Sequence, residues 1–235
     1  MTYSKELNER SPLRVFERSI HGGVGEGKVG VVCASAGVGK SAFLVGIALD
    51  YLMRGHQVLH IAQDQPVDRV RNYYDEIFAE LARSEQLEDA AEVRVRIEQN
   101  RRIHTYQEHS FDIGGLDRTL KFLRTHTDIR PRLMILDDYD WAEGSPDDIN
   151  ELKRIAHDQQ AELWMSVRTQ RGAEHLDEHG YPKLVSSYVP FIDVVVQLKT
   201  ADGAVHLTVL KDHGLERSEP VGVDLDPTTL LLVKR

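Results

Sequence analysis

The residues best suited to chemistry lie in one short segment, residues 34–41, which reads Ala-Ser-Ala-Gly-Val-Gly-Lys-Ser. Glycines let a backbone curl so that successive N–H groups point at one anion. A lysine that follows can reach phosphate oxygens, and a hydroxyl residue after it can bind Mg²⁺. The segment therefore predicts a phosphate-binding loop, in which Lys40 is catalytic and Ser41 is a magnesium ligand. The residues expected to contact a nucleotide are Ser35, Ala36, Gly37, Val38, Gly39, Lys40, Ser41 and Ala42.

The consensus for such a loop is G-x-x-x-x-G-K-[ST], and Ala34 stands at its first glycine. Alanine is small enough for that position. The alternative is an ordinary glycine turn before a helix, which the neighbouring segments disfavour. Apolar residues 29–33 predict a buried strand before the loop, and residues 41–53 have the apolar spacing of a helix after it.

A second acidic element supports this interpretation. Residues 133–136 are all apolar and are followed by Asp137 and Asp138. A carboxylate at the carboxyl end of a buried strand can hold Mg²⁺ directly or through water, so we expect Asp137 to be a metal ligand. Asp138 either activates water or only supports Asp137.

Hydrolysis of a phosphoanhydride needs a group that orients or deprotonates the attacking water. Asp64 is the first candidate for this catalytic role because it follows the apolar residues 58–62, which predict a second strand. Asp138 is the second candidate. The alternative for Asp64 is a helix cap ahead of Pro66.

The elements that must position these residues follow from apolar periodicity along the chain. Strands alternate with helices up to residue 167, and Ala201-Asp202-Gly203 marks a late hairpin. The pattern predicts an α/β fold, with a mostly parallel sheet flanked by helices and antiparallel hairpin strands at the C-terminal end. We expect a single domain over residues 22–235 after an N-terminal extension of residues 1–21. The expected strands are 29–33, 58–62, 102–106, 133–136, 162–167, 194–198, 205–210, 221–225 and 230–233, and the expected helices are 41–53, 66–83, 87–98, 116–125 and 149–159.

Composition limits the classes of partner. The 235 residues carry a formal net charge of −9, which argues against a globally basic nucleic-acid coat without excluding a local basic channel. No apolar run approaches the roughly 18 residues that span a bilayer, and the polar N-terminus does not resemble a signal peptide. Cys33 is the single cysteine and the histidines are scattered, so we expect no disulfide and no zinc site. A cytoplasmic protein without membrane contact is the expectation.

Five segments together resemble the RecA-like family of P-loop NTPases, in the branch that contains DnaB-type helicase ATPase domains and KaiC-like ATPases. The glycine-rich lead-in Gly22-Gly23-x-x-x-Glu26-Gly27 is similar to that of KaiC-like proteins, and a small residue such as Ala34 also opens the loop in the DnaB-type branch. The remaining similar segments are residues 58–66, 165–171 and 209–214.

The resemblance implies ATP and Mg²⁺ as ligands and a homo-oligomer in which one subunit reaches the nucleotide of the next. Lys211 is then the expected trans-acting cation, with Arg171 as another candidate, and Ser166 or Gln170 could sense the γ-phosphate. Asp64 stands where glutamate is usual and His213 where arginine is usual, which implies slow hydrolysis.

The leading functional hypothesis is a single-domain ATPase that acts as an oligomeric switch or motor subunit. One alternative is a nucleotide-dependent regulator that hydrolyses slowly or not at all and recruits a protein partner. Another is a DNA-remodelling ATPase related to the DnaB type.

Overall fold

A nine-stranded sheet in the order β3-β2-β4-β5-β1-β6-β7-β8-β9 organises the chain. The computed structural model describes residues 11–107, 110–170 and 172–235. The six strands from β3 to β6 are parallel to their neighbours, and β7, β8 and β9 continue the sheet in antiparallel pairs. The strands are β1 (Val29–Ser35), β2 (Gln57–Gln63), β3 (Arg101–Tyr106), β4 (Pro131–Asp137), β5 (Glu162–Thr169), β6 (Val194–Ala201), β7 (Ala204–Asp212), β8 (Leu215–Leu225) and β9 (Leu232–Lys234).

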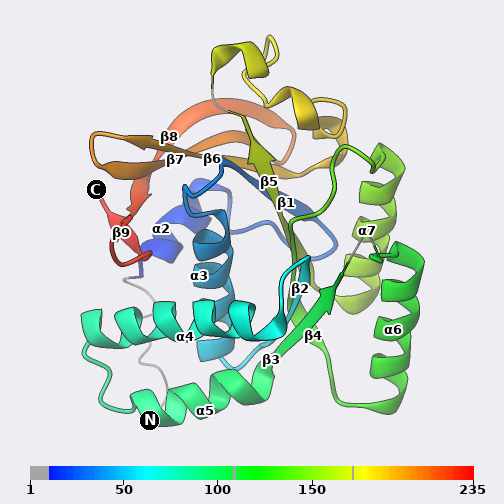
Figure 1. Cartoon of the computed structure of the whole chain (residues 1–235), viewed down its shortest axis with the longest axis vertical. Helices are drawn as coiled ribbons and strands as arrows, with labels where there is room; N and C mark the ends of the chain where they lie inside the picture. The colour runs from blue at the N-terminus through cyan, green and yellow to red at the C-terminus, as the bar shows by residue number, and fades with distance from the viewer. Residues whose placement is uncertain (1–10, 108–109, 171) are drawn as a thin grey trace.

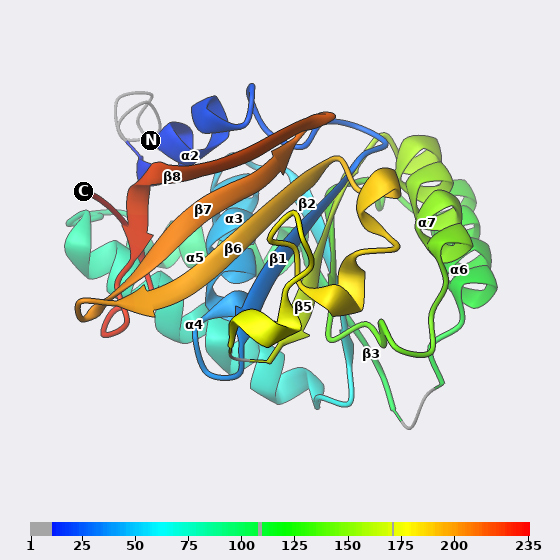
Figure 2. The same ribbon diagram turned by 90° about the horizontal axis from the view of Figure 1, so that it is seen from above.

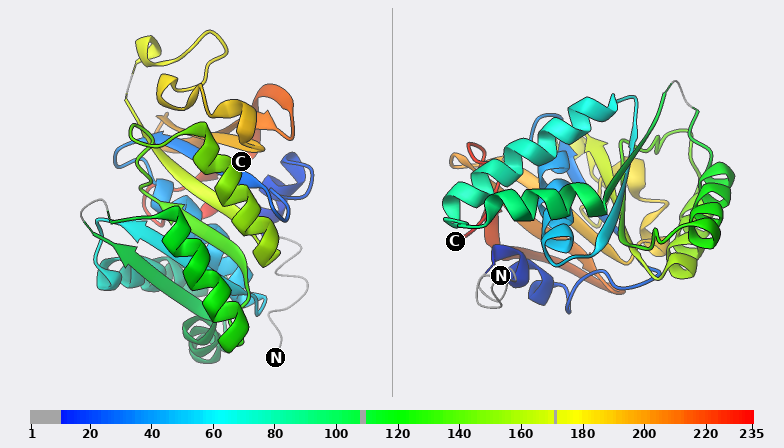
Figure 3. Two further views of the ribbon diagram at one scale, coloured as in Figure 1. Left: turned by 90° about the vertical axis from the view of Figure 1, so that its right-hand side faces the viewer. Right: turned by 90° about the horizontal axis from the view of Figure 1, so that it is seen from below.

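Helices cover both faces of this sheet. Figures 1 and 2 show α6 and α7 together on one side and α3, α4 and α5 on the other, and Figure 3 shows the same separation from two more directions. Two apolar cores correspond to the two faces, so each helix buries one stripe of side chains against the sheet. The helices are α2 (Pro12–Ser19), α3 (Lys40–Met53), α4 (Val67–Ser84), α5 (Ala90–Asn100), α6 (Ile113–His126) and α7 (Pro146–Gln159).

The expected α/β architecture is confirmed. Each predicted strand and helix overlaps an observed one, and the late hairpin forms between β6 and β7. The segment between β5 and β6 contains no long helix or strand among its described residues. Its described residues include three short 3-10 helices, Ala173–His175, Lys183–Val185 and Val189–Phe191. No helix among the described residues has the length and apolarity needed to cross a membrane.

Part of the expected N-terminal extension of residues 1–21 packs against the expected domain. Helix α2 begins at Pro12 after Ser11, whose side chain accepts a hydrogen bond from the Leu13 amide. Phe16 is 1% exposed, and its ring centroid lies 5.3 Å from that of Phe43 in α3. Leu13, Phe16 and Ile20 therefore belong to the apolar core. Leu13, Phe16 and Ile20, at helical spacing, were the signal for this helix.

The first prediction concerns the effect of replacing Gly46 on the free energy of unfolding. Gly46 lies in the middle of α3, and a Cβ built there meets no atom within 4 Å. We expect Gly46→Ala to raise the free energy of unfolding by about 0.5–1 kcal/mol, because alanine loses less backbone entropy in a helix. Gly30→Ala is the matched comparison, since its Cβ would lie 2.7 Å from Val24 and should destabilise. Urea denaturation of both variants checks the opposite signs, and equal signs would contradict the argument.

Candidate phosphate and metal site

The segment between β1 and α3 has the geometry of an anion-binding turn. Gly37 and Gly39 have positive φ angles of 76° and 116°. A Cβ at Gly39 would also lie 2.4 Å from Leu225 Cδ2, so glycine is required there by both conformation and space. Gly39 is the N-cap of α3, and no side chain of the described residues caps this helix. The first-turn amides of Lys40 and Ser41 are therefore available to an anion, which the helix dipole also favours.

The first turn of α3 is tied to the tip of β4. Ser41 Oγ donates a hydrogen bond to Asp137 Oδ2 at 2.8 Å. Asp137 is 2% exposed, and its other oxygen, Oδ1, receives no hydrogen bond from the described residues. A buried carboxylate oxygen without a partner is costly, so this position calls for a cation or a donor from outside the protein.

These two residues fit a magnesium ion. Mg²⁺ prefers hard oxygen ligands at about 2.0–2.1 Å in octahedral geometry, so neighbouring ligands lie roughly 2.9 Å apart. The distance of 2.8 Å between Ser41 Oγ and Asp137 Oδ2 is close to that spacing. Ser41 and Asp137 are thus the residues that would hold the metal, and their role as ligands stays a prediction.

Both residues open into a cavity of about 350 Å³ at the carboxyl ends of the parallel strands. Three cationic side chains face it from three elements, Lys40 from α3, Arg69 from α4 and Arg168 from β5. Two carboxylates, Asp137 and Asp138, face the same space, so groups of both charges surround one volume. The other lining residues are Ala36, Gly37, Gly39, Ser41, Val45, His60, Gln65, Val70, Tyr73 and Leu230.

Asp138 is the carboxylate best placed to act on water. Gln65 Nε2 donates to Asp138 Oδ2 at 2.6 Å, and the Asp138 amide donates to Ser166 Oγ at 3.0 Å. Partial burial and the neighbouring charge of Asp137 raise the pKa of Asp138 above its ordinary value. A raised pKa makes this carboxylate a better proton acceptor than an isolated aspartate.

Asp64 does not line this cavity, so the structure does not support it as the first catalytic candidate. It is exposed, has a positive φ of 54° and donates its amide to the Tyr106 carbonyl at 2.8 Å. The left-handed residue turns the chain after β2, and the next residue, Gln65, reaches the cavity instead. The strand tip was located correctly, but the residue that serves the site is one position later.

Lys211 is not presented to a neighbouring subunit, which corrects the expectation of a trans-acting cation. Its side chain is 8% exposed, and Nζ donates to the Val189 carbonyl at 2.6 Å. Burial lowers the pKa of Lys211. His213 is also tied within the chain, because its Nδ1 lies 2.7 Å from Asp212 Oδ1 and its Nε2 lies 3.0 Å from the Val24 carbonyl.

His213 also belongs to a cluster that sequence spacing did not reveal. His21, Asp212 and His213 bring potential ligand atoms within 4.8 Å of one another. Arg217 donates to Asp212 Oδ2 at 3.0 Å, and His21 Nδ1 lies 2.5 Å from the same oxygen. The central carboxylate is therefore already neutralised, which disfavours a metal ion at this place.

The remaining residues that were predicted to contact the nucleotide do not place their side chains in the phosphate cavity. The side chains of Ser35 and Val38 face a separate cavity, which Gln170 also lines. Ala42 is fully buried. Of Ser35, Val38 and Ala42, only the backbone can therefore contact a ligand in the phosphate cavity. Ser166 is 1% exposed and accepts the Asp138 amide, which is the role of a satisfied strand-end hydroxyl. Arg171 lies outside the described residues.

Two further residues near the strand ends, Trp141 and Cys33, have structural roles. Trp141 is 4% exposed, and its Nε1 donates to the Ser166 carbonyl at 2.8 Å. Cys33 is buried, and burial raises the pKa of its thiol to about 12, which makes it unreactive.

Sequence reasoning missed five polar lining residues, His60, Gln65, Arg69, Tyr73 and Arg168. His60 lies inside a strand and is 2% exposed, and burial together with the charge of Arg101 lowers its pKa to about 3. Its Nδ1 lies 2.9 Å from Tyr74 Oη, while Nε2 has no partner among the described residues. Arg69 and Tyr73 are four residues apart on α4, a helical spacing that could have revealed them once one was known to face the site.

No protein-family model matches this chain, and no curated protein matches it.

The second prediction concerns the metal. Asp137→Asn should weaken nucleotide binding in the presence of Mg²⁺ by at least about tenfold, because an amide is a poorer ligand than a carboxylate. Affinity in the presence of a chelator should change little. Titration of a fluorescent ATP analogue under both conditions measures this, with Asp158→Asn on α7 as the control. An equal loss in both conditions would argue against a metal role.

Proposed function

We propose that this chain is a P-loop NTPase of the RecA-like type that binds ATP with Mg²⁺ and hydrolyses it. The observation that carries the proposal is the convergence of the uncapped α3 terminus, Lys40 and the Ser41–Asp137 pair on one cavity. Ordinary glycine turns lack that set of groups. The strand order, in which β5 separates β1 from β4, supports the same type of fold.

The residues of the cavity suit the transfer of a phosphoryl group to water. Lys40 and the first-turn amides of α3 bind the β- and γ-phosphates, and Ser41 with Asp137 would hold the metal. Bound Mg²⁺ would neutralise charge on the transferred group. Arg69 and Arg168 add positive charge from the far walls of the cavity.

Asp138 and Gln65 both act on the attacking water, Asp138 as the proton acceptor and Gln65 as the group that positions it. The amide of Gln65 holds one oxygen of Asp138, so the second oxygen can accept a proton from water. Glutamine can also orient water by itself, as it does in other NTPases. In this proposal Asp138, and not Asp64, is the base for hydrolysis. The short side chain of Asp64 is therefore no longer the reason for expecting slow hydrolysis.

A homo-oligomer remains part of the proposal, but without Lys211 as the group that reaches a neighbouring nucleotide. Arg168 and Arg69 are exposed and line the cavity within one chain, so in this proposal they supply the cations that a second subunit would otherwise provide. Catalysis therefore does not require a second subunit in this scheme. Light scattering with and without ATP tests the assembly independently of turnover.

The third prediction tests nucleotide binding itself. Lys40→Ala should weaken binding of a fluorescent ATP analogue by about 10–100-fold, because a charge-assisted hydrogen bond contributes about 1.5–3 kcal/mol. Lys121→Ala, on the exposed face of α6, should bind as the unmodified protein does. Circular dichroism checks that both variants are folded. Unchanged affinity in Lys40→Ala would refute the phosphate-binding loop.

The fourth prediction separates the two aspartates. Asp138→Asn should lower turnover by about 100-fold or more while nucleotide affinity stays within about threefold, since general-base catalysis contributes 10²–10⁴ in rate. Asp64→Asn makes the same chemical change outside the cavity and should keep nearly full turnover. Phosphate release measures both. The reverse pattern would return the catalytic role to Asp64, and binding without any turnover in the unmodified protein would favour the regulator hypothesis.

A further inference from the structure

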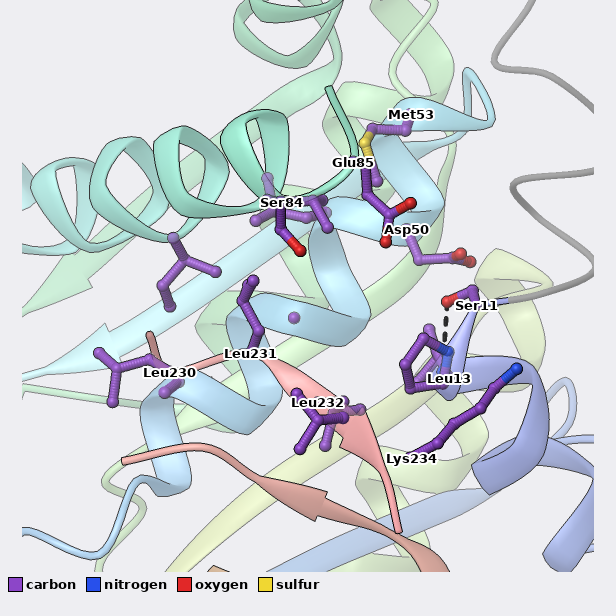
Figure 4. A pocket seen from close by; sticks show the side chains of 17 residues that line it. Ser11, Leu13, Asp50, Met53, Ser84, Glu85, Leu230, Leu231, Leu232 and Lys234 are labelled. Carbon is purple, nitrogen blue, oxygen red and sulfur yellow. Dashed lines mark hydrogen bonds between the residues drawn. The ribbon is translucent and has the colours of Figure 1, made fainter. Parts of the chain in front are cut away.

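The cavity along α3 and the cavity beside the phosphate loop differ in the polar groups that they offer. Figure 4 shows the first, with residues 230–232 on one side and Asp50 toward the other. The Asp50 carboxylate already accepts hydrogen bonds from Arg14 and Arg54. The second cavity has several neutral polar side chains on its wall and a volume of about 620 Å³, within the range of small-molecule sites. It is therefore the better place for a polar ligand.

The cavity beside the phosphate loop lies at the carboxyl ends of β5, β1 and β6, which are neighbours in the sheet. Ser35 pairs with Thr169 across β1 and β5, and Gln197 pairs with Cys33 across β6 and β1. Side chains two residues apart on a strand point the same way, so Ser35, Thr169 and Gln197 lie on one face of the sheet. Figure 2 shows the segment between β5 and β6 next to the ends of β1 and β5, and Leu176 of this segment completes the wall.

Gln197 is the side chain that indicates a ligand. It is 7% exposed, and its amide forms no hydrogen bond with the described residues. The amide oxygen and nitrogen nevertheless keep contact with solvent, unlike the nitrogen of Gln63, which is closed off. Because β1 and β7 flank this part of β6, solvent reaches the amide through the cavity that Gln197 lines. A ligand in the cavity can therefore reach both atoms.

The position of Gln197 in its strand is otherwise apolar. Val194, Val195, Val196 and Leu198 are at most 2% exposed, and Val195, on the same face as Gln197, belongs to the apolar core. An amide that is largely buried without a partner costs free energy, which an apolar residue in this place would avoid. The glutamine is understandable if a ligand supplies the missing hydrogen bonds.

The charges on the cavity wall indicate a ligand that is neutral or carries one negative charge. Lys199 is the only charged residue of the described chain that lines the cavity, and it is exposed. A cationic ligand would meet this positive charge without an acidic partner. Hydroxyl and amide groups provide the rest of the polar wall, and the remaining lining residues are apolar or glycine. These two sets are Ser35, Thr169, Gln170, Gln197 and Thr200, and Val38, Gly172, Leu176 and Leu198.

The two atoms of the Gln197 amide define the matching group on the ligand. A primary amide presents a carbonyl acceptor and an N–H donor side by side. The edge that satisfies both at once carries a donor and an acceptor in the opposite order, as when glutamine pairs with adenine. We propose that this cavity binds a small molecule with such an amide-type edge, as in carboxamides, lactams and nucleobases, and that Gln197 pairs with that edge through two hydrogen bonds.

Occupancy of this cavity should change nucleotide affinity. Ser35 and Val38 lie on its wall and belong to the loop that binds phosphate in the proposed function. The amide-type edge belongs either to the base of the bound nucleotide or to a separate molecule, and the coupling must be reciprocal in the second case. This coupling rests on the proposed function, whereas binding of the amide-type edge does not.

The binding experiment compares benzamide with acetophenone, in which a methyl group replaces the amide nitrogen and removes the donor. NMR titration without nucleotide should give a Kd for benzamide in about the millimolar range. Acetophenone should bind at least about tenfold more weakly, because one hydrogen bond is lost and the Gln197 oxygen stays unpaired. No binding of benzamide at its solubility limit, or equal binding of both compounds, would overturn the proposal.

Variants of Gln197 locate the site. Gln197→Leu should weaken benzamide binding at least about tenfold without lowering the melting temperature, because no hydrogen bond within the described chain is lost. Gln159→Leu makes the same change at a glutamine that is 6% exposed and lies outside this cavity, and it should leave binding unchanged. If Gln197→Leu does not fold, Gln197→Met, which has nearly the shape of glutamine, takes its place. Unchanged benzamide affinity in the folded variant would place the compound elsewhere and overturn the proposal.

The source of the edge is identified with an ATP analogue that carries its fluorescent label on the ribose. A Kd of the analogue that rises in proportion to benzamide concentration assigns the cavity to the base of the nucleotide. A shift of at least about threefold that levels off assigns it to a separate molecule. An unchanged Kd would refute the coupling. Binding of benzamide by a protein that does not bind the analogue at all would refute the proposed function and leave the amide site standing.

Discussion

The hydrogen bond between Ser41 and Asp137 is the constraint on which the phosphate site depends. It joins the first turn of α3 to the tip of β4, although β5 lies between β4 and β1 in the sheet. The partner carboxylate is almost fully buried and keeps one oxygen without a donor from the described residues. A fold optimised only for stability would avoid such a group, because burying an unpaired carboxylate oxygen is costly. The arrangement is understandable if a cation completes it.

The parallel part of the sheet explains why residues far apart in sequence meet there. The carboxyl ends of β1, β2, β4 and β5 all point to one edge, since these strands run in the same direction. The loop after β1, Gln65 after β2, Asp138 after β4 and Arg168 in β5 therefore face one volume. Crevices at this edge are the usual ligand sites of open α/β sheets. The site is thus a consequence of topology as much as of the individual residues.

The features that could be predicted from sequence are those set by local pattern. The turn between β1 and α3 could be predicted because glycines, lysine and serine stand between an apolar run and a helical pattern, and the place of Asp137 because it ends an apolar run. The position of Asp64 could not be predicted in this way. A single left-handed residue after β2 decides which side chain reaches the cavity. Aspartate adopts that conformation more often than most residues do, but most aspartates do not, so its presence alone does not predict the turn.

The prediction that Lys211 is a trans-acting cation was wrong for a different reason. Its sequence position resembles a segment that carries an exposed cation, but the Val189 carbonyl that binds it comes from a short 3-10 helix twenty-two residues earlier. Contacts between such distant segments leave no periodic signature. Arg69 and Arg168 were missed for the same reason, because only the folded chain brings α4 and the end of β5 to the same cavity.

The mixture of charges in the phosphate cavity bears on what it selects. Lys40, Arg69 and Arg168 would attract a bare polyanion, but Asp137 and Asp138 would repel it at short range. In the proposed function, a bound metal ion would remove that repulsion and would pair the unsatisfied oxygen of Asp137. The same five side chains would then favour a metal–phosphate complex over either component alone. Nucleotide binding would depend on Mg²⁺ through Asp137 and Asp138, while the basic residues would hold the phosphates with or without the metal.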